Sequence, residues 1–569
     1  MVLLYQTQSS SRSKGKRINQ GRRIRMQSYR PRYHASVPSG WSNDPNGTVF
    51  YNGKAHLFYQ HFPHKAEWGT MHWGHFTTKD FIKWENEPVA LVPDKDYEII
   101  CGCCSGSAIE KDGNLWLMYT AAQPERQRQC IAISTDGGVT FAKSADNPIL
   151  TSEMLSPEVT ETDCRDPRIF VKDGMYYFIG GARVLTKEEL DAVSKGMTKP
   201  VKNRKGEIVI PARLSGLDFW DPEFISGMGY ADLRSPSAGA LQGDDVIEKD
   251  GFGNLILARS KDLLHWEYVG HLLEEDTEGQ IPMEHEYFCL DGVYECPDYM
   301  KLDGVDVVLT SPQNLPQMGD AYQNVHSGVY MMGELNFDNG RFRVDKIGEL
   351  DHGFDFYAAQ TFRMPDGRVV MTAWKEMWDR NFPTRKEGWA GTYILPRELR
   401  IEDGEFIQRP VREIENYRGN KVTSGPVTIS DGEFSVKGVR GTCAELSVTL
   451  ELGTAKKAGI KLFCGEEHET LVYYDKEAGK IIFDRSKSGI PFSGSEENVD
   501  QRVCAVGKKD SIDLHVFLDI NSIEVFIDGG RYVMTGNVYP DLGKDDGICF
   551  FAEGGSCTFK DLVKYDIEA

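Results

Sequence analysis

The segment KDGNLWLMYT, from Lys111 to Thr120, places an Asp-Gly turn directly before an apolar strand, and this pattern decides the fold. An Asp-Gly or Asn-Gly pair between strand-forming runs is the strongest short-range signal for a β-hairpin. The pattern recurs as YNGKAHLFYQ from Tyr51, KDGMYYFIG from Lys172, LDGVDVVLTS from Leu302 and PDGRVVMTAW from Pro365. The sequence therefore predicts five hairpin units of one kind.

Each hairpin is followed by a further strand signal, so the repeated unit has more than two strands. In three units this third strand runs into a related turn, in TTKDFIKW from Thr77, STDGGVTF from Ser134 and RSKDLLHW from Arg259. Five antiparallel sheets of this kind bury their faces without long free edges when they are arranged radially. The sequence therefore predicts an all-β chain that begins with a five-bladed β-propeller.

The spacing of the repeat is interrupted once. The turn glycines lie about sixty residues apart, except for one step of about double that length. A sixth, degenerate blade would fit the gap, but residues 184–250 lack the repeat and carry Pro, Gly and charge, as long loops do. We therefore predict an insertion at about 184–250 in blade 3, with a helix in TKEELDAVSKG from Thr186. The turn glycines are Gly53, Gly113, Gly174, Gly304 and Gly367.

The strand pattern changes after Leu395. The segment RPVREIENYRG predicts a short helical linker, and alternating segments beyond it, such as ELSVTLEL and SIEVFIDGG, predict a β-sandwich. Ahead of the propeller lies a basic cluster with no apolar stretch after it, which is typical of a disordered extension and not of a secretory signal. The predicted domains are the extension at 1–25, the propeller at 26–408, the linker at 409–418 and the β-sandwich at 419–569.

Composition limits the partners of this chain. The net charge of −21 disfavours a nucleic-acid partner and favours a neutral substrate. No apolar run is long enough to span a bilayer. Twelve cysteines without a signal peptide predict reduced thiols in the cytoplasm and not a disulfide framework. The cluster Cys101, Cys103 and Cys104 lacks a second CxxC or a His pair, so it does not predict a metal site.

Three acidic residues precede the repeated turns at equal depth. Asp44 lies nine residues before Gly53, Asp166 eight before Gly174, and Glu295 nine before Gly304. Because the first strand of each propeller blade lines the central axis, these side chains are expected to meet in one pocket. Carboxylates held together raise the pKa of at least one of them, and an ionised acid beside a protonated acid is what glycosidic cleavage requires.

Each acid also has a structural interpretation. Asp44 and Asp166 both precede proline and could form Asx turns, whereas Glu295 in an apolar stretch would be an unpaired buried charge. The equal depth of the three acids in their blades favours a catalytic role over a structural one. The loops after each second strand are expected to face the same pocket, where aromatic residues such as Trp68 and Trp374 suit either sugar stacking or packing of the rim.

The motifs WSNDPNG, WGTMHWGH, Arg-Asp-Pro, Glu-Cys-Pro-Asp, DFYAAQ and GWAGTYILPREL together resemble glycoside hydrolase family 32. The resemblance runs from about residue 30 to the C-terminus, with DRSKSG and IEVFIDGG matching the sandwich of that family. It implies that Asp44 attacks the anomeric carbon of a β-fructofuranosyl unit, that Glu295 is the acid/base, and that Asp166 holds ring hydroxyls. It further implies fructose-binding roles, with no cofactor or metal, for Asn43, Gln60, Trp68, Ser107 and Arg165.

Two departures from the family pattern bear on the leaving group. Cys104 stands where the family commonly has Phe, and the insertion in blade 3 is larger than usual. The resemblance implies a retaining β-fructofuranosidase acting on sucrose or short fructo-oligosaccharides. Sucrose-6-phosphate hydrolysis, fructan exohydrolysis and fructosyl transfer are alternatives, and a phosphate could be met by basic side chains on the pocket-side loops, Arg126, Arg128, Arg385 and Lys386.

The alternative from another class is a carbohydrate-binding protein without catalysis. The presence of all three acids counts against it, because a binder does not need them. The sandwich edges and the insertion both offer surfaces for a homo-oligomer, whose existence the sequence does not decide.

Overall fold

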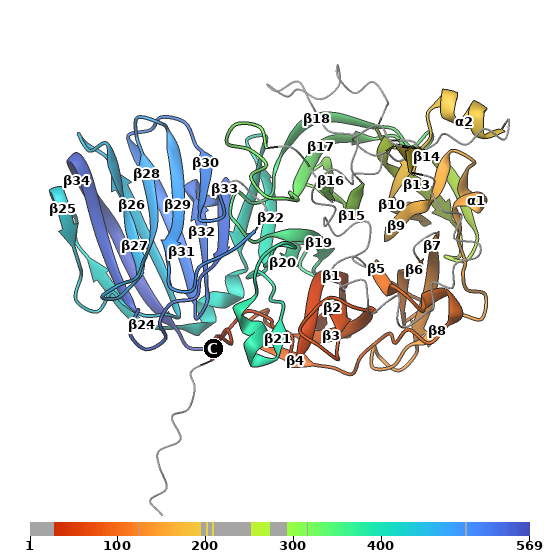
Figure 1. The fold of residues 1–569 in the computed structure, drawn as a ribbon, viewed down its shortest axis with the longest axis horizontal. Helices are drawn as coiled ribbons and strands as arrows, with labels where there is room; N and C mark the ends of the chain where they lie inside the picture. The colour runs from red at the N-terminus through yellow and green to blue at the C-terminus, as the bar shows by residue number, and fades with distance from the viewer. Residues whose placement is uncertain are drawn as a thin grey trace, which may run out of the picture.

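The computed structural model describes residues 28–123, 126–194, 201–202, 208–209, 252–273, 293–313, 315, 317–494 and 498–569. The predicted extension at 1–25 and most of the predicted insertion at 184–250 lie outside these residues. The described chain forms five β-sheets around a common centre, followed by a β-sandwich (Figure 1). This architecture confirms the predicted all-β class, the five-bladed propeller and the C-terminal sandwich.

Each predicted turn joins the first two strands of one blade. The turn glycines adopt positive φ, for example 75° at Gly53 and 90° at Gly304, which explains why glycine ends each pair. Blade 1 contains β1 (Gly40–Tyr51), β2 (Lys54–Phe62), β3 (His72–Thr78) and β4 (Trp84–Asn86), and blade 2 contains β5 (Gly102–Lys111), β6 (Asn114–Gln123), β7 (Arg126–Ser134) and β8 (Ala142–Lys143). Blade 3 contains β9 (Val159–Lys172), β10 (Met175–Val184), β13 (Phe252–Ser260) and β14 (Trp266–His271), and blade 4 contains β15 (Tyr294–Leu302), β16 (Val305–Pro312), β17 (Val329–Leu335) and β18 (Phe342–Glu349). Blade 5 contains β19 (Tyr357–Arg363), β20 (Val369–Trp374), β22 (Arg397–Glu402) and β23 (Glu405–Pro410).

Strands β1, β5, β9, β15 and β19 are the innermost strands of their sheets and surround the centre of the propeller (Figure 1). The chain leaves blade 3 at the end of β10 and returns as β13, its neighbour in the sheet. The predicted helix is present as α2 (Lys187–Ser194). It begins after a capping box, in which the Glu189 amide donates to Thr186 Oγ1 at 3.2 Å and the Thr186 amide donates to Glu189 Oε2 at 2.9 Å.

Two distant segments close the ring of blades. Strand β21 (Trp389–Ala390) lies in the chain between β20 and β22 of blade 5, but it pairs in parallel with β1 of blade 1, through Gly40 and Trp41. The contact is close, since a Cβ on Gly391 would lie 2.0 Å from Ser42 Oγ. Other short elements are η1 (Asp96–Glu98), α1 (Ser152–Leu155), β11 (Val201–Lys202), β12 (Ile208–Val209), η2 (Pro383–Glu387) and η3 (Arg412–Tyr417).

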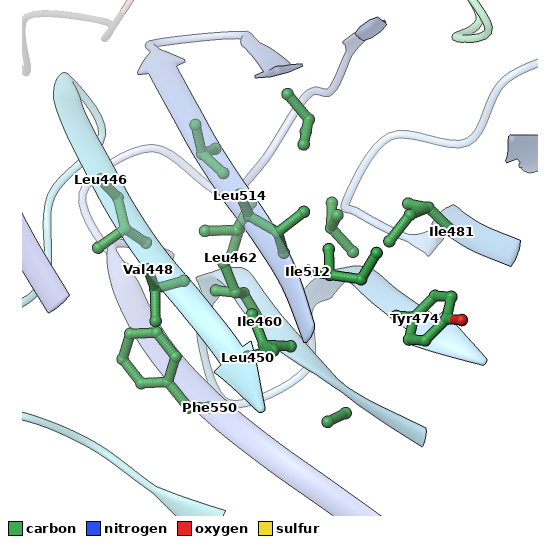
Figure 2. Packing of buried hydrophobic residues seen from close by; sticks show 14 of the residues in the cluster. Leu446, Val448, Leu450, Ile460, Leu462, Tyr474, Ile481, Ile512, Leu514 and Phe550 are labelled. Atoms are coloured by element: carbon green, nitrogen blue, oxygen red, sulfur yellow. The ribbon is translucent and has the colours of Figure 1, made fainter. Parts of the chain in front are cut away.

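The C-terminal sandwich is held by an apolar core. Strand β26 alternates buried and half-buried positions, so that Leu446, Val448 and Leu450 point into this core beside Ile460 and Phe550 (Figure 2). Each such side chain contributes about 1.5–3 kcal/mol when fully buried. The strands are β24 (Arg418–Ser424), β25 (Val427–Phe434), β26 (Ala444–Glu451), β27 (Lys457–Cys464), β28 (Glu469–Asp475), β29 (Lys480–Lys487), β30 (Gln501–Ala505), β31 (Ser511–Asp519), β32 (Ser522–Ile527), β33 (Tyr532–Asn537) and β34 (Gly547–Ile567), with η4 (Asp528–Gly530).

Buried charges join the two domains. Arg397 Nη2 of blade 5 lies 2.9 Å from Asp351 Oδ2 and 3.0 Å from Glu524 Oε2 of the sandwich. Both ring nitrogens of His34 lie 2.8 Å from carboxylate oxygens, one of Asp519 and one of Glu524. Since the Arg397 charge is buried, it needs these carboxylate partners, and together with the hydrogen bonds of His34 they fix the sandwich against the propeller.

Candidate active site

The structure brings the three predicted acids together at the centre of the propeller. Asp44 comes from β1, Asp166 from β9 and Glu295 from β15, and each is at most 8% exposed. Cys296 connects them, because its amide donates to Asp166 Oδ2 at 3.0 Å and its thiol lies 3.4 Å from Asp44 Oδ2. Arg165 Nη2 donates to Glu295 Oε1 at 3.0 Å.

The pairing of each innermost strand is interrupted at the level of these acids. Register shifts fall between Ser42 and Pro45 in blade 1, between Glu295 and Asp298 in blade 4, and between Tyr357 and Gln360 in blade 5. Blades 2 and 3 carry equivalent shifts. Such bulges re-aim side chains next to functional sites, and they turn the polar groups of these strands toward the axis.

Asp44 is surrounded by hydrogen-bond donors. Asn43 Nδ2 donates to Oδ1 at 3.0 Å, and Ser105 Oγ donates to Oδ2 at 2.9 Å, on the side where the Cys296 thiol also lies. Burial and then the charge of Glu295 raise the pKa of Asp44, while the three donors oppose that rise. The donors therefore favour the ionised form that a nucleophile requires.

Glu295 has a different environment. Its Oε1 accepts from Arg165, and its Oε2 accepts a hydrogen bond from the Tyr357 hydroxyl. Arg165 is held from the other side by Asp163, whose Oδ1 lies 2.9 Å from Nη1. Burial alone would lower the pKa of Arg165, but Glu295, Asp163 and Asp166 outweigh it and raise this pKa. The guanidinium thus stays charged beside the acids.

Asp166 sits at a left-handed backbone position, with φ of 59°. Its amide donates to Thr120 Oγ1 of blade 2 at 2.9 Å, and its Oδ2 accepts from the Cys296 amide. Burial raises the pKa of Asp166 to about 7, with Arg165 opposing and Glu295 adding to the rise. Burial thus raises the pKa of the acid on β9 as it does that of the acid on β1.

The remaining predicted binding residues lie close to this group, with two corrections. Asn43 and Arg165 contact the acids directly, and Gln60 is buried on β2, where Nε2 donates to Cys103 O at 3.1 Å. Trp68 packs against an aromatic cluster that also contains Tyr357 and Cys296.

The first correction concerns Ser107. This side chain is fully buried between blades 2 and 3, where its hydroxyl donates to Pro167 O at 2.6 Å and accepts from the Ile169 amide at 2.8 Å. Its hydroxyl is hydrogen-bonded to backbone atoms of Pro167 and Ile169, so it lies outside the acid network. Ser105, two residues earlier, contacts Asp44 instead, because the register shift between Cys104 and Gly106 turns it inward.

The second correction concerns Trp374. The sequence predicts it on a loop at the rim of the pocket, but it is the last residue of β20 and is fully buried. Its ring packs 5.7 Å from that of Trp41 and 5.1 Å from that of Trp378, measured between centroids. Trp374 therefore supports the wall behind the site and offers no face to a ligand.

Sequence reasoning missed Tyr357, Cys296 and Ser105 as members of the site. Tyr357 lies ten residues before Gly367, at nearly the same depth as the acids, so the turn-spacing rule could have found it. Cys296 follows Glu295 directly, but its contact with Asp44 depends on a backbone φ of 46°, which the sequence does not reveal.

Three further observations concern metal binding, a cavity and membrane-spanning helices. Among the described residues, no cluster of three or more His, Cys, Asp or Glu side chains could hold a metal ion. A cavity of about 650 Å³ lies between blades 3, 4 and 5, but none of the three acids lines it. No helix in the described ranges is long and apolar enough to cross a bilayer.

Comparison with known proteins assigns both domains. Residues 34–192 and 246–410 match the family model of the glycosyl hydrolases family 32 N-terminal domain, and residues 413–566 match the family 32 C-terminal model. A sucrose-6-phosphate hydrolase of Zymomonas mobilis is 32% identical over 94% of this chain and 91% of its own length. A raffinose invertase of Escherichia coli is 30% identical over 92% of each chain.

Solved structures agree with the family models. A β-fructofuranosidase of Bombyx mori has a TM-score of 0.68 at 28% identity, covering 95% of this chain and 94% of its own. A variant of that protein has been solved in complex with sucrose. A sucrose-6-phosphate hydrolase from Lactobacillus gasseri has a TM-score of 0.71 at 26% identity, covering 95% of this chain and 93% of its own.

Proposed function

This chain belongs to glycoside hydrolase family 32, and on that premise we propose that it is a retaining β-fructofuranosidase acting on sucrose or short fructo-oligosaccharides. The observation that carries this proposal is the placement of Asp44 and Glu295 in one buried network, in which Cys296 follows Glu295 in the chain and its thiol contacts Asp44. Three donors favour the ionised form of Asp44, and Glu295 is near enough for its charge to raise the pKa of Asp44. Two neighbouring carboxyl groups, one of them surrounded by donors, suit a double displacement.

In the proposed reaction, Asp44 attacks the anomeric carbon of the fructofuranosyl unit while Glu295 gives its proton to the leaving oxygen. This step yields a fructosyl ester of Asp44 and frees the aglycone. Glu295, now ionised, then takes a proton from water, whose oxygen attacks the same carbon and releases fructose and the Asp44 carboxylate. The chain requires no cofactor for either step.

The residues around these two acids would bind the fructosyl unit. We assign Asp166 to ring hydroxyls, where hydrogen bonds that tighten as positive charge develops on the ring stabilise the transition state. Arg165, Asn43, Gln60 and Trp68 would complete the binding site. We assign a fructose-binding role to Ser105 in place of Ser107, because the Ser105 hydroxyl contacts Asp44.

Sucrose-6-phosphate is the second candidate substrate. Relatives at 32% and 30% identity carry that activity in their names. Arg385 lies with its guanidinium carbon 5.6 Å from the Trp41 ring centroid, next to the strand that bears Asp44, and Lys386 follows it in η2. A phosphate on the glucosyl unit could be met there. Fructan exohydrolysis and fructosyl transfer are further alternatives, as a levanase of Bacillus subtilis is 28% identical.

We further propose a cytoplasmic location and a small-molecule or oligosaccharide substrate, with no nucleic-acid or membrane partner. No disulfide bond joins the cysteines among the described residues, which suits a reducing compartment. The net charge of −21 opposes binding to polyanions. A homo-oligomer formed through the sandwich edges is compatible with this proposal.

The test is a panel of sucrose, its 6-phosphate, kestose, inulin and levan, scored for free fructose and for longer products. We expect fructose from sucrose or kestose in the wild type, and losses of at least about 10²–10⁴-fold in Asp44→Asn and Glu295→Gln. Circular dichroism would establish that both variants are folded. Turnover unchanged in either folded variant would refute that residue's role, and binding of sugars without any release would favour the non-catalytic alternative.

A further inference from the structure

The segment that leads into β19 is bound to the sandwich. Strand β33 is an outermost strand of the sandwich sheet, and residues 351–355 of the propeller lie along it. The amide of His352 donates to Val533 O at 2.8 Å, and that of Phe354 donates to Thr535 O at 2.7 Å. In return, the Thr535 amide donates to Asp351 Oδ1 at 2.8 Å. We call residues 351–355 the docking segment.

Gly353 shows how closely the docking segment approaches. A Cβ on this residue would lie 2.1 Å from Thr535 O and 2.2 Å from Thr535 N, both backbone atoms that cannot rotate away. Any side chain here would force the segment away from β33. The docking thus depends on the absence of a side chain at one position in the propeller.

Arg485 of β29 fixes the end of the docking segment. Its Nη1 donates to Asp355 Oδ2 at 2.8 Å and to Asn537 O at 3.0 Å, and Asp355 Oδ2 also accepts from the Asn537 amide at 2.8 Å. The guanidinium lies 3.8 Å from the ring centroid of Phe354 and 3.5 Å from that of Phe492. Close to two aromatic rings and fully buried, this cation has little freedom to move.

Asp355 stands two residues before Tyr357, whose hydroxyl donates to Glu295 Oε2. The next residue, Ala358, has a left-handed φ of 54° and donates its amide to Ser311 Oγ at 3.1 Å. The ring of Tyr357 is therefore held between one anchor on the sandwich and one on blade 4. Movement of the first anchor moves the hydroxyl relative to Glu295.

We propose that the C-terminal sandwich is a positioning element for the acid/base. Through Arg485 and β33 it holds the docking segment, and the docking segment holds Tyr357 against Glu295. This proposal rests on the proposed role of Glu295. Arg485 is a positioning residue, because it acts through the docking segment, whereas Tyr357 contacts the carboxyl group of Glu295 itself.

A double-variant comparison separates positioning from general stability. We expect Arg485→Met and Tyr357→Phe each to lower kcat about tenfold, with KM changed by less than about twofold, and the double variant to lose no more than Tyr357→Phe alone. Arg485→Lys, which keeps the cation, should recover part of the loss. Losses that multiply in the double variant, or an unchanged kcat in folded Arg485→Met, would overturn the proposal.

A second measurement does not depend on activity. Hydrogen exchange of the peptide covering residues 357–363 should accelerate at least about tenfold in Gly353→Ala and stay at the wild-type rate in Gly425→Ala, where a Cβ meets no atom within 4 Å. Equal exchange in the two variants would overturn the positioning role even if Arg485→Met fails to fold. A wild type that releases no fructose would refute the proposed function instead, and the exchange rates would still decide whether the sandwich orders β19.

Discussion

The thiol of Cys296 lies 3.4 Å from Oδ2 of Asp44, so the residue that follows Glu295 in the chain contacts the acid of blade 1. The amide of the same residue donates to Asp166 at 3.0 Å. Cys296 thereby joins the three acids of the site. It is bonded to Glu295 in the chain, its backbone amide binds Asp166 and its side chain contacts Asp44. This arrangement makes Cys296 sensitive to substitution without giving it a part in bond making.

Replacing Cys296 with Ala should move the acidic limb of the kcat/KM profile to higher pH. The thiol lowers the pKa of Asp44, which burial and Glu295 raise, so its loss lets that pKa rise further. Asp44 is the proposed nucleophile and must be ionised, so activity should be lost at a higher pH as the solution is acidified. Cys296→Ser retains a donor and is the matched control. An acidic limb unchanged in Cys296→Ala would contradict this account.

Ser105→Ala and Ser107→Ala should have different effects, although they are two residues apart. Ser105→Ala removes a donor from the Asp44 carboxylate, raises the pKa of Asp44 and moves the acidic limb upward, with little change in stability. Ser107→Ala leaves the buried Ile169 amide without its partner, which costs about 1–3 kcal/mol of stability. Urea unfolding and pH profiles of both variants test the distinction. The reverse assignment of effects would restore Ser107 to the site.

Asp298 shares a motif with Glu295 but should act in stability. Its Oδ1 lies 2.8 Å from Arg168 Nε, and the amides of Tyr299 and Thr361 donate to its carboxylate. Asp298→Asn should lower the free energy of unfolding by about 3–5 kcal/mol, because it leaves the Arg168 charge uncompensated. Asp345→Asn, in an exposed pair with Arg343, should cost less than about 1 kcal/mol. Similar losses in the two variants would contradict the prediction.

Acidification should weaken the contact between propeller and sandwich. Burial alone would raise the pKa of Glu524, but His34 and Arg397 outweigh it and lower that pKa to about 2 from 4.5. A depressed carboxyl pKa contributes stability above the unfolded value, and this contribution is lost as pH falls from about 4.5 to about 2. It amounts to about 3 kcal/mol. Unfolding free energies should fall less steeply over this range in Glu524→Gln, and parallel curves would refute the assignment.

The turn glycines were sufficient to predict the propeller, because a positive φ at Gly53 and its equivalents is a local requirement that the sequence displays. The equal depth of Asp44, Asp166 and Glu295 followed from the same turns, since strand length alone sets the distance from turn to axis. The convergence of these acids was therefore predictable before their partners were known.

The identity of the neighbouring residues was not predictable in the same way. Whether Ser105 or Ser107 faces Asp44 depends on a register shift in β5, and one shifted residue exchanges the two faces of a strand. The burial of Trp374 was not predictable for a related reason, because the sequence does not show where β20 ends and the next loop begins. The contact of Arg485 with Asp355 joins residues 130 positions apart, beyond the reach of any local pattern.

The parallel pairing of β21 with β1 has a consequence for biosynthesis. Gly40 and Trp389, which pair at this junction, are translated near opposite ends of the propeller sequence. Strand β1 of the first blade therefore has no β21 to pair with until translation has passed β20 of the fifth blade. During that interval the nascent chain carries an open ring, and a chaperone that shields the waiting edge would have its greatest effect then.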